Sequence, residues 1–335
     1  MNRALITGGT GFVGTYLAAF LKERGSQIAV LASAGCDAKV QATECYEVDI
    51  RDAERVRSAI DDFRPDYIYH LAAVSSVDLS WKSPRLTYEV NVFGTLNVLE
   101  AATTLPSPPR ILNVSTAQVY GPSRLPISED SLIGPDNPYA ASKAMAELMA
   151  LQYRNQNTEI VTARSFNHTG PGQSSDFVLS SIARQFAEIE AGLYEPRLAV
   201  GNVHVKRDFT DVRDVVRAYT MLLENGASRE TYNVCSGCSW SIKELIGQFE
   251  SASGINVAVE TQPERRRTGE ISEVRGNPSK IRTAIGWEPQ IPLETTIQDL
   301  LTYWRSAVRD QSTLQNTSSA ALNTDYVATT PLRSK

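Results

Sequence analysis

The sequence predicts an α/β protein, with a doubly wound parallel sheet and a smaller C-terminal α/β lobe. In the first half of the chain, short apolar runs alternate with longer amphipathic stretches, which is the pattern of repeated βαβ units. The apolar runs are nearly continuous, as expected of strands buried on both faces. The length of 335 residues is enough for two lobes.

The predicted elements follow in order from the N-terminus. Strands are expected at 4–7, 27–32, 46–50, 67–73, 110–115 and 159–165. Helices are expected at 13–25, 52–63, 86–104 and 138–154. In the second half the rhythm loosens, with helices predicted at 177–192, 210–226, 241–252 and 293–308 and a strand at 231–237.

We therefore expect a dinucleotide-binding domain at 1–165, with elements near 205–240 returning to it, and a substrate lobe at 166–310. The tail, 311–335, is rich in Ser, Thr, Asn and Ala without any period, and is predicted to be disordered. The net charge of -5 argues against a nucleic-acid binder, and no apolar run is long enough to span a membrane. Four cysteines are too few for a disulfide scaffold, so a cytoplasmic protein is expected.

A glycine-rich turn joins the first strand to the first helix. Gly8, Gly11 and Gly14 let the backbone turn tightly and approach a pyrophosphate at the positive end of that helix, with Phe12 and Val13 in the same turn. The position between a strand and a helix predicts a Rossmann-type dinucleotide site, rather than a tight turn without a ligand.

The end of the second strand bears on the choice of cofactor. The sequence there is Ala-Ser-Ala around Ser33, without the acid that binds the ribose 2′-hydroxyl of NAD or an arginine for a 2′-phosphate. NADP(H) is favoured, and NAD(H) remains an alternative. Asp49 and Ile50, after the third strand, are candidates to hold adenine, although Asp49 could equally cap the helix that begins near Asp52.

Tyr139 and Lys143 lie one helical turn apart on the same face of a predicted helix. A phenol has an ordinary pKa near 10, and a nearby cation lowers it towards the working range. Such a tyrosine can exchange a proton with a carbonyl or hydroxyl group. Ser115 and Thr116 end a strand upstream, which places a hydroxyl group on the cofactor side of the sheet.

These motifs resemble the extended short-chain dehydrogenase/reductase family, in its nucleotide-sugar branch. The resemblance covers about residues 1–308 and rests on GGTGFVG, DIRD, HLAA, NVFGT, STAQVYG and YAASK. It implies a catalytic set of Thr116, Tyr139 and Lys143, in which Lys143 also binds the nicotinamide ribose. It further implies a cofactor-lining segment of Leu71, Ala72 and Ala73, a structural or water-holding Asn91, and a homodimer formed through helices 86–104 and 138–154.

Two positions after Thr116 help to choose the reaction. Dehydratases of this branch carry a glutamate that removes a C5 proton, whereas this chain has Ala117 and Gln118. An amide cannot take up a proton at a useful pKa, which argues against dehydration.

The second lobe resembles the GDP-mannose group, notably its GDP-4-keto-6-deoxy-D-mannose reductases. The similar segments are 165–178, 207–216 and the Arg-x-x-Glu spacing from Arg267 to Glu270, where Thr268 replaces the usual proline. The resemblance implies that Asn167, Arg207 and Arg267 hold the diphosphate and that Glu270 contacts the ribose. Arg265 or Arg266 could take the place of Arg267. Further substrate-binding candidates are Ser75, Ser76, Val178 and Arg184.

The resulting hypothesis is reduction of a GDP-linked 4-keto-6-deoxy sugar to GDP-D-rhamnose or GDP-6-deoxy-D-talose. The alternatives are a nucleotide-sugar 4-epimerase with bound NAD and a non-catalytic dinucleotide sensor. Several candidates also have structural interpretations: Arg207 and Asp208 as a surface ion pair, 265–267 as a solvated loop, and Ser75 and Ser76 as loop residues. We predict structural roles, rather than metal binding, for His70 and His168. Redox or metal use is not expected of the single CxxC motif formed by Cys235 and Cys238.

Overall fold

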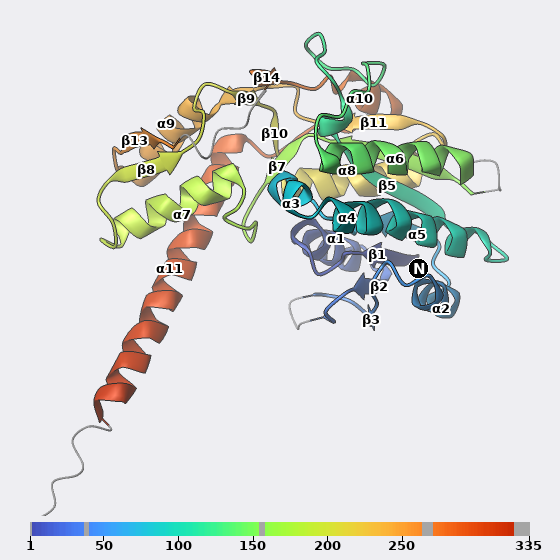
Figure 1. Cartoon of the computed structure of the whole chain (residues 1–335), viewed down its shortest axis with the longest axis horizontal. Coiled ribbons are helices and arrows are strands. Elements are labelled where there is room, and N and C mark those ends of the chain that lie inside the picture. The colour runs from blue at the N-terminus through green and yellow to red at the C-terminus, as the bar shows by residue number, and fades with distance from the viewer. Residues whose placement is uncertain (1, 37–39, 154–157, 263–270, 325–335) are drawn as a thin grey trace, which may run out of the picture. The chain divides into compact units, whose positions relative to one another are not determined.

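The computed structural model describes residues 2–36, 40–153, 158–262 and 271–324, and for 311–324 it describes the backbone alone (Figure 1). The chain divides into two compact units. Unit 1 comprises Met1–Thr169, His204–Ile242 and Gly269–Leu293, and unit 2 comprises Gly170–Val203, Lys243–Thr268 and Glu294–Lys335. Within the described ranges, no helix combines the length and the hydrophobicity needed to cross a membrane.

Unit 1 is built on a parallel seven-stranded sheet in the order β11-β6-β5-β4-β1-β2-β3. The strands are β1 Arg3–Thr7, β2 Gln27–Ala32, β3 Glu44–Glu47, β4 Tyr67–His70, β5 Arg110–Thr116, β6 Ile160–Ser165 and β11 Thr231–Val234. This confirms the predicted Rossmann-like α/β fold.

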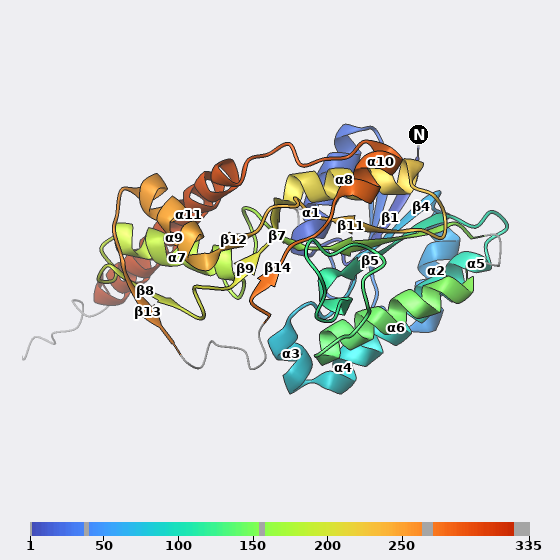
Figure 2. The same ribbon diagram turned by 90° about the horizontal axis from the view of Figure 1, so that it is seen from above.

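Helices cover both faces of this sheet, as Figure 2 shows. The helices on one face are α1 Phe12–Glu23, α8 Val212–Asn225 and α10 Ser279–Ile285. Those on the other are α2 Ala53–Phe63, α5 Gly94–Thr103 and α6 Pro138–Tyr153. Because both faces are covered, the central strands are apolar along their length, and two separate cores form above and below the sheet.

The predicted helix at 86–104 is interrupted in the structure. After α3 Val77–Lys82 the chain forms α4 Pro84–Tyr88, then a π-helix, η1 Glu89–Phe93, and then α5. The π-helix includes Asn91, whose side chain is held inside by three hydrogen bonds. Gly94, at the end of the π-helix, lies so close to Ile50 that a Cβ atom there would be 2.6 Å from the Ile50 side chain. The wider turn of the π-helix accommodates these contacts of Asn91 and Gly94, which the hydrophobic periodicity of the sequence does not reveal.

Two small sheets complete unit 1 near the carboxyl end of β6. One pairs β7 Asn167–Thr169 with β10 Phe209–Asp211, and the other has the order β12 Trp240–Ser241, β9 Lys206–Arg207 and β14 Glu273–Val274. Asp208, between β9 and β10, is fully buried and accepts backbone hydrogen bonds from Ser236, Gly237 and Gly276. Asp208 is therefore a structural anchor, and the predicted interpretation of Arg207 and Asp208 as a surface ion pair is wrong.

Unit 2 contains α7 Val178–Glu190, β8 Arg197–Val200, α9 Ile242–Ser253, β13 Ala258–Thr261 and α11 Leu293–Thr324. Phe186 and Phe249 stack in its core, and Arg305 of α11 forms two 2.6 Å hydrogen bonds to Glu190 of α7. The structure continues α11 to Thr324, into the segment predicted to be disordered, and 325–335 lie outside the described residues.

Cys36 and Cys45 form a disulfide that closes the segment between β2 and β3. Cys235 is buried and Cys238 is exposed, and both are free thiols. A count of four cysteines does not predict this pair, because the pairing depends on β3 lying beside β2.

Candidate active site

The glycine-rich turn after β1 forms a cradle that no larger residue could form. Gly8 has a φ of 68°, and a Cβ atom there would lie 2.9 Å from the Ala72 Cα atom. A Cβ atom on Gly14 would lie 2.5 Å from the carbonyl oxygen of Gly8. Gly11 precedes α1 without a side-chain cap, and the first turn of α1 has no acidic residue. The backbone N–H groups around Phe12 and Val13 therefore suit a pyrophosphate, and the turn fits a dinucleotide cofactor.

Other predicted cofactor residues follow the neighbouring strands. Ser33 is exposed after β2, and Ile50 is buried after β3. Asp49 is bound by the side chain of Arg51, with a closest distance of 2.6 Å, and this hydrogen bonding lowers the pKa of the Asp49 carboxyl group. The helix cap is Asp52, which accepts a hydrogen bond from the Arg55 backbone, so the alternative of Asp49 as the cap is wrong.

The segment Leu71, Ala72 and Ala73 follows β4 and is fixed by a buried histidine. The Thr95 hydroxyl donates to the Asn91 carbonyl at 2.7 Å, so its oxygen accepts the proton on His70 Nε2 at 2.8 Å. His70 Nδ1 then accepts from the Thr7 hydroxyl, whose oxygen accepts from the Ala72 N–H group. Burial lowers the pKa of His70 to about 3, so this histidine is neutral and structural, as predicted.

Thr116, Tyr139 and Lys143 come together beyond the carboxyl end of β5. Thr116 ends β5 and caps the short helix η2 Ala117–Val119, and Asn137 caps the start of α6 through the Ala140 N–H group. The Tyr139 side chain is buried and hydrogen-bonded to that of Thr116. The Lys143 ammonium donates to the Val114 carbonyl at 2.7 Å.

The pKa values in this set are governed by burial. Burial raises the pKa of Tyr139 above 10, and the hydrogen bond to Thr116 opposes that shift. Burial lowers the pKa of Lys143 to about 8, while the carboxylate of Glu147 raises it. The expected lowering of the Tyr139 pKa by Lys143 is not found, because desolvation dominates at Tyr139 and the ammonium is directed to a backbone carbonyl. At neutral pH the phenol is therefore protonated and can act as a proton donor.

The residues after Thr116 provide no acid. Ala117 is buried, and Gln118 is exposed with its amide oxygen accepting from Asn137 at 3.3 Å. A neutral amide thus stands where the dehydratases have a glutamate.

The predicted substrate residues are distributed over both units. In unit 1, Asn167 opens β7 and is exposed, and Arg207 on β9 donates to the Ile271 carbonyl at 2.9 Å. Ser75 is exposed, and Ser76 caps α3. In unit 2, Val178 begins α7, and Arg184 is paired with Glu188 at 2.7 Å. Arg265, Arg266, Arg267 and Glu270 lie outside the described residues.

Two further buried charged residues, on α6 and β6, were not singled out from the sequence. Glu147 on α6 and Arg164 on β6 form an ion pair at 2.8 Å. The available signal was the spacing of four residues between Lys143 and Glu147, which places both on one helix face. Among the described residues, no cluster of three His, Cys, Asp or Glu side chains is arranged to hold a metal ion.

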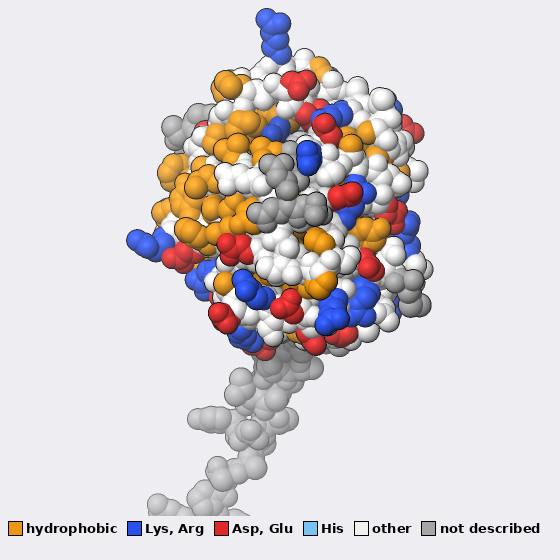
Figure 3. All heavy atoms as spheres, turned by 90° about the vertical axis from the view of Figure 1, so that its right-hand side faces the viewer, with side chains coloured by type: hydrophobic (Ala, Val, Ile, Leu, Met, Phe, Trp, Pro, Cys, Tyr) orange, Lys and Arg blue, Asp and Glu red, His pale blue; other side chains and the backbone are white. Residues whose placement is uncertain are grey.

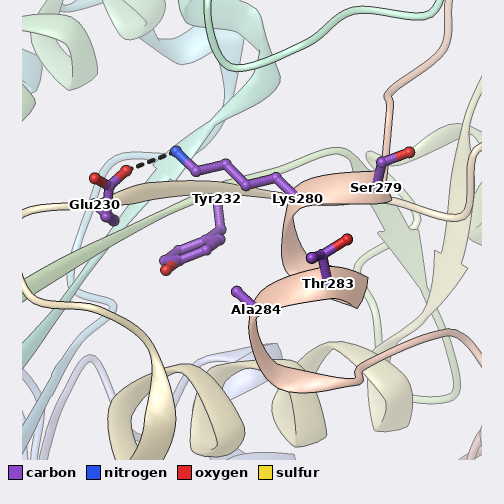
Figure 4. A pocket seen from close by; sticks show the side chains of 6 residues that line it. All are labelled: Glu230, Tyr232, Ser279, Lys280, Thr283 and Ala284. Carbon is purple, nitrogen blue, oxygen red and sulfur yellow. Dashed lines mark hydrogen bonds and ion pairs between the residues drawn. The ribbon is translucent and has the colours of Figure 1, made fainter.

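A separate hollow of about 460 Å³ lies where α10 meets the edge strand β11 (Figure 4). The Lys280 ammonium is paired with Glu230 at 2.7 Å and lies over the ring of Tyr232. None of the predicted site residues line this hollow.

Comparison with known proteins places the chain among nucleotide-sugar enzymes. Residues 5–300 match the family described as GDP-mannose 4,6 dehydratase. The chain is 35% identical over 314 residues to a GDP-6-deoxy-D-mannose reductase of Pseudomonas aeruginosa, covering 92% of this chain and 99% of that protein. It is similar to the structure of RMD from Pseudomonas aeruginosa complexed with NADPH, with a TM-score of 0.82, 34% identity and coverage of 92% and 100%. It is also similar to a Thermus thermophilus UDP-glucose 4-epimerase complexed with NAD, with a TM-score of 0.81, 30% identity and coverage of 91% and 99%.

Proposed function

Because the chain belongs to the GDP-mannose 4,6-dehydratase family, we propose that it is an NADPH-dependent reductase of the C4 ketone of GDP-4-keto-6-deoxy-D-mannose. The product is GDP-D-rhamnose, or GDP-6-deoxy-D-talose if the opposite face of the sugar is presented. The observation that carries this proposal is the buried phenol of Tyr139, hydrogen-bonded to Thr116 and one turn from Lys143. A phenol that carries its proton at neutral pH can donate it to a ketone oxygen on which negative charge develops.

The chain's own residues have distinct roles in this reaction. NADPH, held by the glycine-rich turn and Lys143, would supply the hydride for the ketone carbon. Tyr139 donates its proton to the ketone oxygen as negative charge develops there, and Thr116 donates a hydrogen bond to the same oxygen. Lys143 stabilises the phenolate left on Tyr139 and binds the nicotinamide ribose. Burial of Tyr139 and Lys143 strengthens these interactions, because charges interact more strongly away from water.

Gln118 favours reduction over dehydration. Elimination of water from the sugar requires a base at C5, and the amide of Gln118 cannot supply one. The 4-keto sugar must then come from another enzyme that carries out the dehydration.

The preference for NADPH rests on the segment after β2. Ser33 leaves no carboxylate to repel a 2′-phosphate, and the similar Pseudomonas aeruginosa structure was determined with NADPH. Gly8, Gly11, Phe12, Val13 and Gly14 would hold the pyrophosphate. The adenosine and nicotinamide ends would lie against Ser33, Asp49, Ile50, Leu71, Ala72 and Ala73.

The nucleotide part of the substrate is assigned to a set of mainly basic and polar residues. Arginine offers forked donors that match phosphate oxygens, and a glutamate accepts from ribose hydroxyl groups. The assigned residues are Asn167, Val178, Arg184, Arg207, Arg267 and Glu270, with Ser75 and Ser76 at the sugar.

We also propose that the protein is a homodimer through α5 and α6. Apolar side chains on this side of unit 1 are strongly exposed: Phe93 at 57%, Met145 at 48%, Leu148 at 62% and Leu151 at 41%. Figure 3 shows hydrophobic side chains gathered on the side of the molecule where these helices lie. Exposed apolar patches of this kind mark interaction sites.

The test of the proposed reaction is incubation with GDP-4-keto-6-deoxy-D-mannose and NADPH, with Tyr139→Phe as the control. Stoichiometric oxidation of NADPH is expected in the wild type. The rate of this oxidation should fall by about 10²–10⁴-fold in the variant. The second candidate, a 4-epimerase, is favoured by the similarity to the epimerase complexed with NAD. An epimerase would show no net oxidation of NADPH, and tightly held NAD would be released on denaturation.

A further inference from the structure

A buried ion pair joins the catalytic helix to the sheet. The guanidinium group of Arg164 contacts both carboxylate oxygens of Glu147, with Nε–O distances of 3.1 Å and an Nη2–Oε2 distance of 2.8 Å. Its Nη1 donates to the hydroxyl group of Tyr120 at 2.9 Å. The two paired side chains are 9% and 10% exposed.

This pair lies at the level of the candidate catalytic residues. Glu147 follows Lys143 by one helical turn, and both are on the buried face of α6. Arg164 is the register partner of Ser115, which directly precedes Thr116. The Lys143 ammonium itself donates to Val114 on β5.

Stability alone does not explain the pair. A buried ion pair must offset the loss of hydration of two charges, and apolar side chains of similar volume often stabilise a fold equally well. The pair has a further consequence, because the Glu147 carboxylate opposes the effect of burial on the Lys143 ammonium.

No other carboxylate takes the place of Glu147 beside Lys143 among the described residues that face it. Tyr139 on α6 and His70 on β4 are neutral near pH 7, and Arg164 on β6 has the same charge as Lys143. On the π-helix, Glu89 is paired with Arg51. The remaining charged side chains on α3, α4 and α5 are exposed: Asp78, Lys82, Arg85 and Glu100.

We propose that Glu147, held by Arg164, is a positioning residue that keeps Lys143 charged beside Tyr139. This inference rests on the proposed function. In it, Glu147 touches neither substrate nor cofactor and acts through Lys143. Arg164 fixes the direction of the Glu147 carboxylate.

The test is the pH dependence of kcat for the variants Glu147→Gln and Arg164→Met. Removing the carboxylate leaves the effect of burial on Lys143 unopposed, so the basic limb of the profile should move to lower pH by about one unit. Removing Arg164 leaves the Glu147 carboxylate without the partner that holds it, so Arg164→Met should move the limb in the same direction. A loss of kcat by the same factor at every pH in both variants, with the limb unmoved, would overturn the proposal and indicate a packing role.

Two further measurements keep the test independent of folding and of turnover. If Glu147→Gln does not fold, the double variant Glu147→Gln/Arg164→Met, which leaves no unpaired charge, should still show the lowered limb. NADPH binding, followed by fluorescence, should weaken as the pH is raised and Lys143 loses its charge. In Glu147→Gln this weakening should begin at a lower pH than in the wild type, whatever the turnover. An unchanged pH dependence of binding would count against Glu147, whereas absence of turnover in the wild type would count against the proposed function.

Discussion

Reduction of the Cys36–Cys45 disulfide should lower the stability of unit 1. The two cysteines are separated by nine positions. The cross-link closes a loop of about that length in the unfolded chain and so reduces the conformational entropy of the unfolded state. The loop-entropy relation gives about 2.6 kcal/mol at 25 °C for a loop of this size. Cys45 lies exposed on the edge strand β3, so a reductant can reach the bond without unfolding of the protein.

The assay is urea unfolding of the protein with and without a thiol reductant. The denatured protein should show two free thiols before reduction and four after it, since Cys235 and Cys238 are free. The matched control is the double variant Cys36→Ser/Cys45→Ser, whose unfolding should not respond to reductant. Equal unfolding midpoints for the oxidised and reduced wild type, with the thiol counts as expected, would refute the entropic argument.

Four other predictions address the cofactor turn, the active site, its effect on stability and the proposed interface. Gly14→Ala should weaken NADPH binding by about tenfold or more in a fluorescence titration. The new methyl group would meet the Gly8 carbonyl at 2.5 Å, and overpacking of that kind costs about 1–3 kcal/mol. An affinity equal to that of the wild type would contradict the role of the turn. The wild-type kcat should fall as pH rises through about 8, since Lys143 then loses its charge, and a flat profile to pH 10 would contradict this. The same rise in pH should not unfold the protein, because Lys143 has a lower pKa in the folded than in the unfolded state, so its contribution to stability increases as the pH rises from one value to the other. Leu148→Glu should convert dimers to monomers in light scattering, and an unchanged mass would place the interface elsewhere.

The sheet could be predicted because its strands carry a strong local signal. Strands such as 27–32 and 159–165 are apolar along their length, and the glycine turn at 8–14 marks the first strand–helix junction. Helix spacing pointed to Tyr139 and Lys143, a strand end pointed to Thr116, and the family resemblance implied that the three form the catalytic set. These features depend on residues close in sequence.

Features that depend on tertiary contacts were not predictable in this way. The π-helix at Glu89–Phe93 arises from the contacts of Asn91 with Val74 and Ser142, which are distant in the chain. The partner of Glu147, Arg164, is on a different element, so the sequence around Glu147 does not indicate that its carboxylate is buried and paired. The raised pKa of Tyr139 reflects burial, which the spacing of Tyr139 and Lys143 does not report.

The proposed reduction of the C4 ketone is tested most directly with NADPH deuterated at both C4 positions of the nicotinamide and with GDP-4-keto-6-deoxy-D-mannose as substrate. The account predicts one deuterium at C4 of the product sugar, detected by NMR, together with one equivalent of oxidised cofactor. A turned-over sugar without deuterium at C4, or the absence of any product, would contradict the assignment of the chain as a reductase.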